Sequence, residues 1–240
     1  MIPNSNLLWK DDFSINGLLD ALRKFNAKER FYLVGQFLGN PEFKPKEDRL
    51  ADLEKLLKIT EGTFVKAKKF CAMDYHLDWL NGALESAFLD KREGSLNEEE
   101  SCKYRITGTQ QDIDLLLAFE TPGHRFYIVL VEAKGVSSFL PAQLESKLDR
   151  LDAIFFKNNQ PRFDVEVHLV LAVPPEIQES VKSQWPENNK WKPKFIDLPI
   201  REDLLKITRT DDHGKPTKKD WKKWKIEKRP KLGKKEKADV

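Results

Sequence analysis

Apolar residues recur at helical spacing along the first seventy residues of the chain. The spacing predicts three helices, over residues 15–25, 28–38 and 48–59. Gly39 ends the second of these apolar patterns and begins a break in the chain. We therefore interpret residues 1–70 as a helical N-terminal region that carries no obvious chemistry.

From residue 74 onwards, helical patterns alternate with strand-like runs. Helices are predicted over residues 74–90, 141–156, 176–184 and 202–207. Strands are predicted over residues 102–107, 112–119, 126–131, 165–173 and 195–198. Three strands in succession favour an antiparallel meander, and the helix that follows them provides a crossover to a parallel strand. We predict an α/β fold for residues 71–207, in which helices flank a mixed sheet.

The helix predicted over residues 74–90 has a polar face as well as an apolar one. Its polar face is formed by Asp74, Asp78, Asn81 and Glu85, which are spaced at i, i+4, i+7 and i+11. One interpretation is a face exposed to solvent. The other is that one carboxylate, with Glu85 as the candidate, lies near an active site.

Charge is distributed unevenly along the chain. The net charge is only +3, but the segment 214–237 holds 12 Lys or Arg residues and 3 Asp or Glu residues, a local charge of +9, so the rest of the chain carries −6. Residues 208–240 are interpreted as a basic, flexible tail. The tail residues predicted to bind nucleic acid are Lys218, Lys219, Trp221, Lys222, Lys223 and Trp224. The alternatives are a solvated tail whose tryptophans dock on the body, and a regulatory tail that binds an acidic partner.

Several functional classes lack support in this sequence. The two cysteines form no CxxC motif, the four histidines have no zinc-binding spacing, and there is no phosphate-binding GxxxxGK[ST] motif. No apolar run approaches the roughly 18 residues of a membrane span. The N-terminus lacks the pattern of a signal peptide. We therefore expect a cytoplasmic protein that does not insert into membranes.

Charged residues stand at the ends of two of the most apolar predicted strands. Asp112 and Asp114 begin one strand, whereas Glu132 and Lys134 follow the run FYIVLV of the next. If residues 121–125 form the connecting turn, Glu120 pairs with the residue at 126, and Asp114 then lies opposite Glu132 on the same face. Buried charges at such a position are costly unless they meet a cation or each other.

This arrangement fits the hydrolysis of a phosphodiester. Two carboxylates can hold Mg²⁺, with Mn²⁺ as a substitute, and the bound ion polarises a phosphate and lowers the pKa of a bound water. Lys134 would orient that water and offset the charge that develops on the phosphate. Gln143 and Lys147, one turn apart in the next helix, could contact the water or a phosphate.

These residues together resemble the PD-(D/E)XK, or restriction-endonuclease-like, nuclease superfamily. The likeness lies in Asp114 of QQDIDLLLAF, Glu132 and Lys134 of VLVEAKG, and Gln143 of PAQLESKLDRL. It covers about residues 74–173 and implies an αβββαβ core. Two features depart from the family pattern, because Ile113 replaces the proline and Asp112 competes with Asp114 for its role.

The resemblance also implies roles for single residues. Asp114, Glu132 and the carbonyl of Ala133 would bind the metal, with Lys134 and Gln143 as further catalytic residues. The accessory candidates are Asp112, Glu85 and Lys147. The expected function is a metal-dependent endonuclease or exonuclease acting on DNA. Cutting of both strands would favour a homodimer. The alternative is a module of the same fold that binds nucleic acid or protein without cleaving it.

Overall fold

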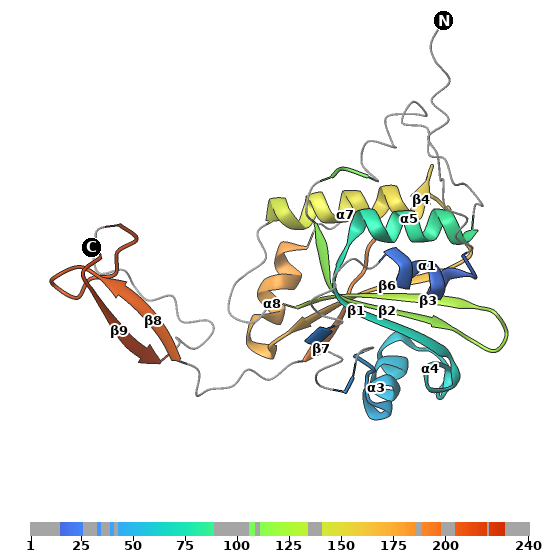
Figure 1. Cartoon of the computed structure of the whole chain (residues 1–240), viewed down its shortest axis with the longest axis horizontal. Helices are drawn as coiled ribbons and strands as arrows, with labels where there is room; N and C mark the ends of the chain where they lie inside the picture. The colour runs from blue at the N-terminus through green and yellow to red at the C-terminus, as the bar shows by residue number, and fades with distance from the viewer. Residues whose placement is uncertain are drawn as a thin grey trace, which may run out of the picture.

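A mixed five-stranded β-sheet organises the chain (Figure 1). The computed structural model describes residues 15–25, 33–34, 39–40, 43–88, 106–108, 111–133, 141–185, 189–197, 205–219 and 221–228. The strands of the sheet are β1 (Lys68–His76), β2 (Asp112–Glu120), β3 (Phe126–Ala133), β6 (Glu166–Val173) and β7 (Lys194–Asp197). They lie in the order β1-β2-β3-β6-β7; β1, β2 and β3 are antiparallel, whereas β3, β6 and β7 are parallel. The mixed α/β class predicted from the sequence is confirmed.

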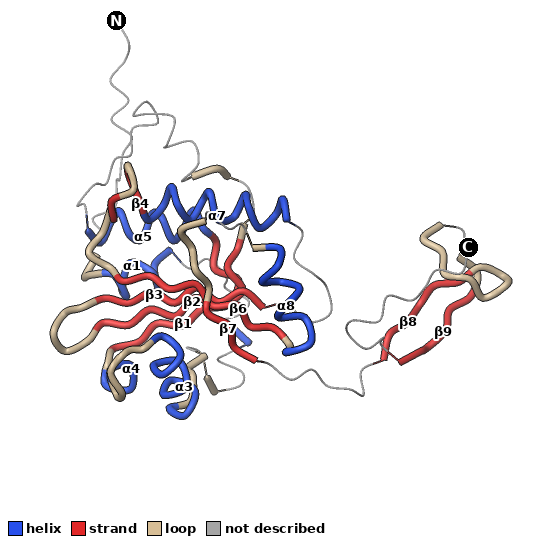
Figure 2. Tube along the Cα trace, turned by 180° about the vertical axis from the view of Figure 1, so that it is seen from behind, coloured by secondary structure: helices blue, strands red, loops and turns tan. Residues whose placement is uncertain are grey.

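Helices cover both faces of this sheet (Figures 1 and 2). On one face lie α1 (Leu18–Phe25), α5 (Leu77–Phe88), α7 (Pro141–Phe155) and α8 (Pro175–Gln184). On the other lie α3 (Glu47–Leu57) and the short α4 (Thr63–Lys66). Each face has its own apolar core, because successive side chains of a strand point to opposite sides of the sheet. No helix in the described part of the chain is long and apolar enough to cross a membrane.

The N-terminal helix α1 packs directly on α5. The Tyr75 hydroxyl donates a hydrogen bond of 2.9 Å to the carbonyl of Leu22, which ties α1 to β1. Gly82 allows the close approach of the two helices, because a Cβ at that position would lie 2.7 Å from Cε1 of Phe25. The region predicted as an N-terminal helical segment therefore contributes to the same core as the sheet. The helix predicted over 28–38 lies almost wholly outside the described residues.

The register of β2 and β3 is the one that the sequence predicts. Glu120 pairs with Phe126 and Leu115 with Val131, and residues 121–125 form the turn between them. His124 in this turn is exposed and has a φ of 55°. The pairing of the two strands ends at Leu115 and Val131, one residue short of Asp114 and Glu132.

Most other elements also follow their apolar patterns. Helices α3, α7 and α8 and strands β6 and β7 lie within a few residues of the predicted ranges. The predicted end of the helix at residue 156 is slightly late, because residues 156–161 form a small hairpin of β4 (Phe156–Lys157) and β5 (Gln160–Pro161). Its turn residues Asn158 and Asn159 both have positive φ, as a tight hairpin turn requires.

The first strand of the sheet is not where the sequence pattern placed it. The predicted strand over 102–107 lies mostly outside the described residues, and residues 106–107 are not in a strand. The antiparallel neighbour of β2 is β1, which precedes α5 and includes residues assigned to the helical region and to the start of the 74–90 helix. Asp74 has a φ of 47°, a left-handed conformation that interrupts the alternation of a regular strand.

This interruption reaches the neighbouring strand. Tyr75 and its partner Ile113 belong to the same core as Ala72 and Leu116, although strict alternation would place them on the opposite face. Regular alternation of side chains in β2 therefore breaks between Ile113 and Leu116. Asp114 lies at the point where β2 changes the face that it presents to the core.

The C-terminal segment contains a second, separate sheet. Strands β8 (Leu205–Thr210) and β9 (Lys223–Lys228) pair as an antiparallel hairpin, which Figure 1 draws to one side of the main body. The helix predicted over 202–207 is replaced at 205–207 by the start of β8. The segment predicted as a flexible tail from residue 208 is folded as this hairpin up to residue 228.

Packing of α7 on the sheet should determine much of the stability. Leu151 is fully buried in this contact, so Leu151→Ala should lower the free energy of unfolding by about 2–5 kcal/mol. Asp149→Ala changes an exposed residue of the same helix and should alter stability by less than about 0.5 kcal/mol. Chemical denaturation measures both. Equal losses in the two variants would contradict this account of how α7 packs.

Candidate active site

The ends of β2 and β3 bring two carboxylates together beside an exposed stretch of backbone. Asp114 Oδ2 accepts a hydrogen bond of 2.7 Å from the backbone N–H of Ala133. The backbone pairing of β2 with β3 ends at Leu115 and Val131, so this side-chain bond continues the link between the strands beyond the regular ladder. Asp114 is thereby fixed next to the residue that follows Glu132.

Glu132 is a buried charge that receives a partner from α7. Its side chain is 5% exposed, and its Oε1 lies 2.6 Å from the Lys147 ammonium. The same ammonium donates a 2.8 Å hydrogen bond to the backbone carbonyl of Asp112. Removing a carboxylate from water is costly unless a close cation and hydrogen bonds compensate. Lys147 therefore joins the beginning of β2, the end of β3 and helix α7.

A second buried cation, Arg150, lies one turn further along α7. Its side chain is 3% exposed and forms an ion pair with Asp78 of α5. It also donates a 3.2 Å hydrogen bond to Gln111, whose amide nitrogen contacts the Ser146 hydroxyl at 3.1 Å. Burial lowers the pKa of Arg150, while the negative charges of Asp78 and Asp112 oppose that shift. Asp112 therefore acts electrostatically on Arg150, whereas Asp114 contacts the end of β3.

Asp78 also holds the segment that leads into β2. Its carboxylate accepts hydrogen bonds from the backbone N–H groups of Thr107 and Gly108, at 3.0 and 3.1 Å. Together with Arg150, these bonds connect α5, α7 and the approach to Asp112. Of the polar face predicted for the 74–90 helix, Asp78 thus contacts α7, whereas Asp74 lies in β1 and not in the helix.

The structure places Glu85 away from this group. The carboxylate of Glu85 lies 2.6 Å from Arg162, which also donates a hydrogen bond to the carbonyl of Ile154 near the C-terminal end of α7. Residues 147 and 154 are separated by about 10 Å along the axis of that helix, at a rise of about 1.5 Å per residue. Through Arg162, Glu85 therefore lies near the C-terminal end of α7, away from Lys147.

Two of the predicted catalytic side chains cannot be placed. Lys134 lies outside the described residues, immediately after Ala133 in the sequence. Gln143 belongs to the first turn of α7, but its side chain is among those that are not described. The structure therefore pairs Glu132 with Lys147 and places Asp114 against the backbone of Ala133, the residue after Glu132. The roles of Lys134 and Gln143 remain predictions.

With the residues described at this site, a hard cation would need a mixed set of carboxylate, backbone and water oxygens. Among the described residues, no group of three or more His, Cys, Asp or Glu side chains is arranged to hold a metal ion. A metal here would need Asp114 and Glu132 together with a backbone carbonyl, such as that of Ala133, and water. Oxygen donors of these types match the preference of Mg²⁺, which keeps several of its waters when bound to protein.

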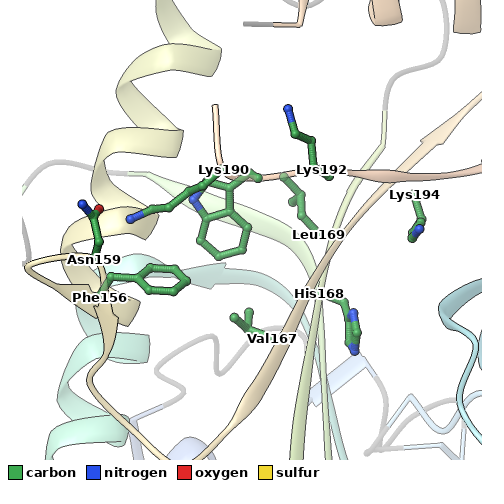
Figure 3. Close-up of a pocket in the computed structure, with 9 residues that line it drawn as sticks. Phe156, Asn159, Val167, His168, Leu169, Lys190, Lys192 and Lys194 are labelled. Atoms are coloured by element: carbon green, nitrogen blue, oxygen red, sulfur yellow. The ribbon is translucent and has the colours of Figure 1, made fainter. Parts of the chain in front are cut away.

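A cavity of about 570 Å³ opens elsewhere, beside the first half of β6 (Figure 3). Figure 3 shows Phe156, Asn159 and Lys190 on one side of it and His168 and Lys194 on the other. The described residues that line it are Phe156, Asn159, Val167, His168, Leu169, Lys190, Trp191, Lys192 and Lys194. The described residues that line it include no carboxylate, and none is a predicted site residue.

Two lining residues of the cavity already have acidic partners. The Lys190 ammonium lies 3.0 Å from Asp152, and His168 lies 2.9 Å from Glu166. Burial lowers the pKa of His168, and Glu166 opposes that shift. Lysines favour an anion in this cavity, but the paired carboxylates required for metal-dependent hydrolysis lie at the other end of β6, where Glu132 pairs with Leu171.

Sequence reasoning missed the role of Arg150 and its partner Asp78. A signal was present on α7, because Gln143, Lys147 and Arg150 are spaced at i, i+4 and i+7 and so share one face of the helix. No comparable signal identified Asp78, since its partners are 29 to 72 residues away in the sequence.

Comparison with known proteins does not assign a function. No family model matches the chain, and no curated protein or solved structure matches it either. Function is therefore inferred from the side chains of the site itself.

The ion pair between Glu132 and Lys147 can be tested through stability. Lys147→Met would leave the buried carboxylate without its cation, so the free energy of unfolding should fall by about 3–5 kcal/mol. The double variant Glu132→Leu/Lys147→Met should recover most of this loss, because it removes both charges. Denaturant unfolding provides the measurement.

The matched control for this pair is the more exposed one between Lys190 and Asp152, which also involves α7. Lys190→Met should cost less than about 1 kcal/mol. If Lys147→Met were as mild as this control, or if the double variant were less stable than Lys147→Met, Glu132 would not depend on Lys147.

Proposed function

We propose that this protein is a metal-dependent nuclease that hydrolyses phosphodiester bonds of DNA, with Asp114 and Glu132 as its metal ligands. The observation that carries the proposal is the contact of Asp114 with the backbone N–H of Ala133, directly beside Glu132. It holds two carboxylates at adjacent strand ends, one of them partly exposed. Such a pair matches the ligands of Mg²⁺ in enzymes that act on phosphates.

The order of elements lends further support. The antiparallel strands β1, β2 and β3 are followed by α7 and the parallel strand β6. The resemblance to the PD-(D/E)XK nucleases implies the order αβββαβ. The strands and α7 follow this order, but α5, the helix predicted ahead of the strands, lies between β1 and β2. Asp114 and Glu132 lie on the two strands that carry the acidic residues of that motif. The proposed core is therefore restriction-endonuclease-like.

In this proposal each residue of the site has a separate role. Asp114 and Glu132 hold the ion, with the carbonyl of Ala133 as a third donor. The chemistry supplied by the bound ion is polarisation of the phosphate and a lower pKa for a bound water. Lys134 orients that water and offsets charge on the phosphate. Lys147 acts as a positioning residue, because it fixes the carboxylate of Glu132 through a direct ion pair.

A non-catalytic binding module is the second candidate. One observation favours it: the charge of Glu132 is already balanced by Lys147 at 2.6 Å without a metal ion. A carboxylate that needs no metal for neutralisation can be a purely structural group. Activity and metal binding separate the two functions.

Cleavage tests the catalytic proposal. Plasmid and single-stranded DNA, incubated with Mg²⁺ or Mn²⁺, should be cut by the wild-type chain. Asp114→Asn, Glu132→Gln and Lys134→Ala should each reduce the rate by at least about 100-fold, because each removes a group that contacts the metal, the water or the phosphate. Glu120→Gln is the matched control, since Glu120 is a carboxylate at the other end of β2 and contacts Lys68 and His124. Cutting that persists in all the site variants would reject the mechanism.

Metal binding is expected to follow the same residues. Titration calorimetry with Mn²⁺ should detect a site that Asp114→Asn and Glu132→Gln each weaken at least tenfold, because each variant replaces a charged oxygen ligand by a neutral one. Glu120→Gln should bind Mn²⁺ like the wild type. The binding-module alternative predicts instead that all four proteins behave alike and that none cleaves DNA.

A further inference from the structure

The β8–β9 hairpin presents a surface that the proposed active site does not use. Cross-strand pairs join Leu205 to Lys228, Ile207 to Ile226 and Arg209 to Trp224. Directly opposite residues of an antiparallel pair lie on the same face, and alternate residues of a strand do so too. We call this face the aromatic face, and its described side chains are Leu205, Ile207, Arg209, Trp224 and Ile226.

Large apolar side chains dominate the aromatic face and are open to solvent. Trp224 is 60% exposed, Ile207 72% and Ile226 56%. Leu205, at the end of the same face, is also exposed. A two-stranded sheet alone is only marginally stable in water, and a cluster of exposed apolar side chains of this kind marks a binding surface.

Positive charge surrounds the aromatic face. Residues 205–228 contain nine Lys or Arg residues and four Asp or Glu residues, a net charge of +5. Arg209 lies on the aromatic face itself, and Lys223 and Lys225 lie on the opposite face of β9. The occupant of this surface should therefore be a polyanion that also offers flat apolar groups.

Single-stranded nucleic acid meets both requirements. Its phosphates attract lysines through the release of counterions, and its unpaired bases stack on aromatic side chains. A duplex offers the phosphates but keeps the faces of its bases inside the stack. A second copy of this chain would bring one hairpin of charge +5 against another of equal charge.

We propose that the β8–β9 hairpin binds single-stranded nucleic acid, with bases stacked on Trp224 and phosphates held by lysines of the hairpin. This inference deepens the proposed nuclease function, on which it rests, by naming single strands as the substrate class. In this proposal the hairpin supplies the affinity for the single strand, and Asp114 and Glu132 supply the hydrolysis.

The test uses the full chain carrying Asp114→Asn, in the presence of a chelator, so that binding is measured without cleavage. The probe is a fluorescent oligodeoxythymidine of about 15 nucleotides, and fluorescence anisotropy at several salt concentrations gives affinity and salt dependence. Trp224→Ala should weaken binding by about 5- to 100-fold with an unchanged salt slope, because it removes stacking and no charge. Trp224→Phe should retain most of the affinity.

Lys225→Gln provides the complementary change. It removes one charge without altering the aromatic face, so the salt slope should fall by about 0.7. A duplex of the same length should bind more weakly than the single strand and should be insensitive to Trp224→Ala. Equal binding of the single strand by the parent and Trp224→Ala proteins would overturn the proposal. So would a duplex that binds as tightly and loses as much affinity in that variant.

Sedimentation of the same variants tests whether the aromatic face instead binds a second copy of the chain. If Trp224→Ala converts an oligomer to a monomer while strand binding is unchanged, the aromatic face binds a second copy of the chain and the proposal fails. Separate cleavage assays keep the two functions distinct. If the wild-type chain binds single strands through Trp224 but cuts no DNA, the nuclease proposal alone is rejected. If the wild-type chain cuts DNA and Trp224→Ala binds single strands normally, the hairpin proposal alone is rejected.

Discussion

The rest of the site depends on one buried ion pair, that of Glu132 with Lys147. An acidic residue at the end of so apolar a strand cannot be covered by a helix unless that helix supplies a cation. Helix α7 does this while its apolar residues Leu148 and Leu151 pack against the sheet. The position of α7 along the sheet is therefore fixed by polar as well as by apolar contacts. The ends of β2 and β3, where Asp114 contacts Ala133, are held in place as a result.

Much of this arrangement could be predicted because it depends on local patterns. The run FYIVLV and the turn at 121–125 determine the register of β2 and β3. Just beyond this pairing, Asp114 accepts a hydrogen bond from the backbone N–H of Ala133, next to Glu132. Strand β1 could not be predicted, since Asp74 adopts a left-handed conformation within it and charged residues obscure its pattern. The partners of Asp78 and Glu85 were equally hidden, because Arg150 and Arg162 reach them from distant parts of the chain.

The uneven distribution of charge along the chain is consistent with the proposed function. The chain outside the segment 214–237 carries −6, so its surface repels phosphates on average, and carboxylates at the site add to that repulsion locally. A basic hairpin folded as its own sheet can supply the attraction that an acidic site lacks. Separate parts of the chain would then provide affinity and hydrolysis, which explains why charge asymmetry along the sequence was informative although the total of +3 was not.

The outer strands of the large sheet have a consequence for self-assembly. Strand β7 has only four residues, and β1 begins with Lys68 and Lys69 and contains the left-handed Asp74. Short, charged or distorted edges resist pairing with strands of another molecule, and this protects a protein from aggregation. The edges of this sheet therefore disfavour its extension by a strand of a second copy, and a dimer of this protein is expected to use other surfaces.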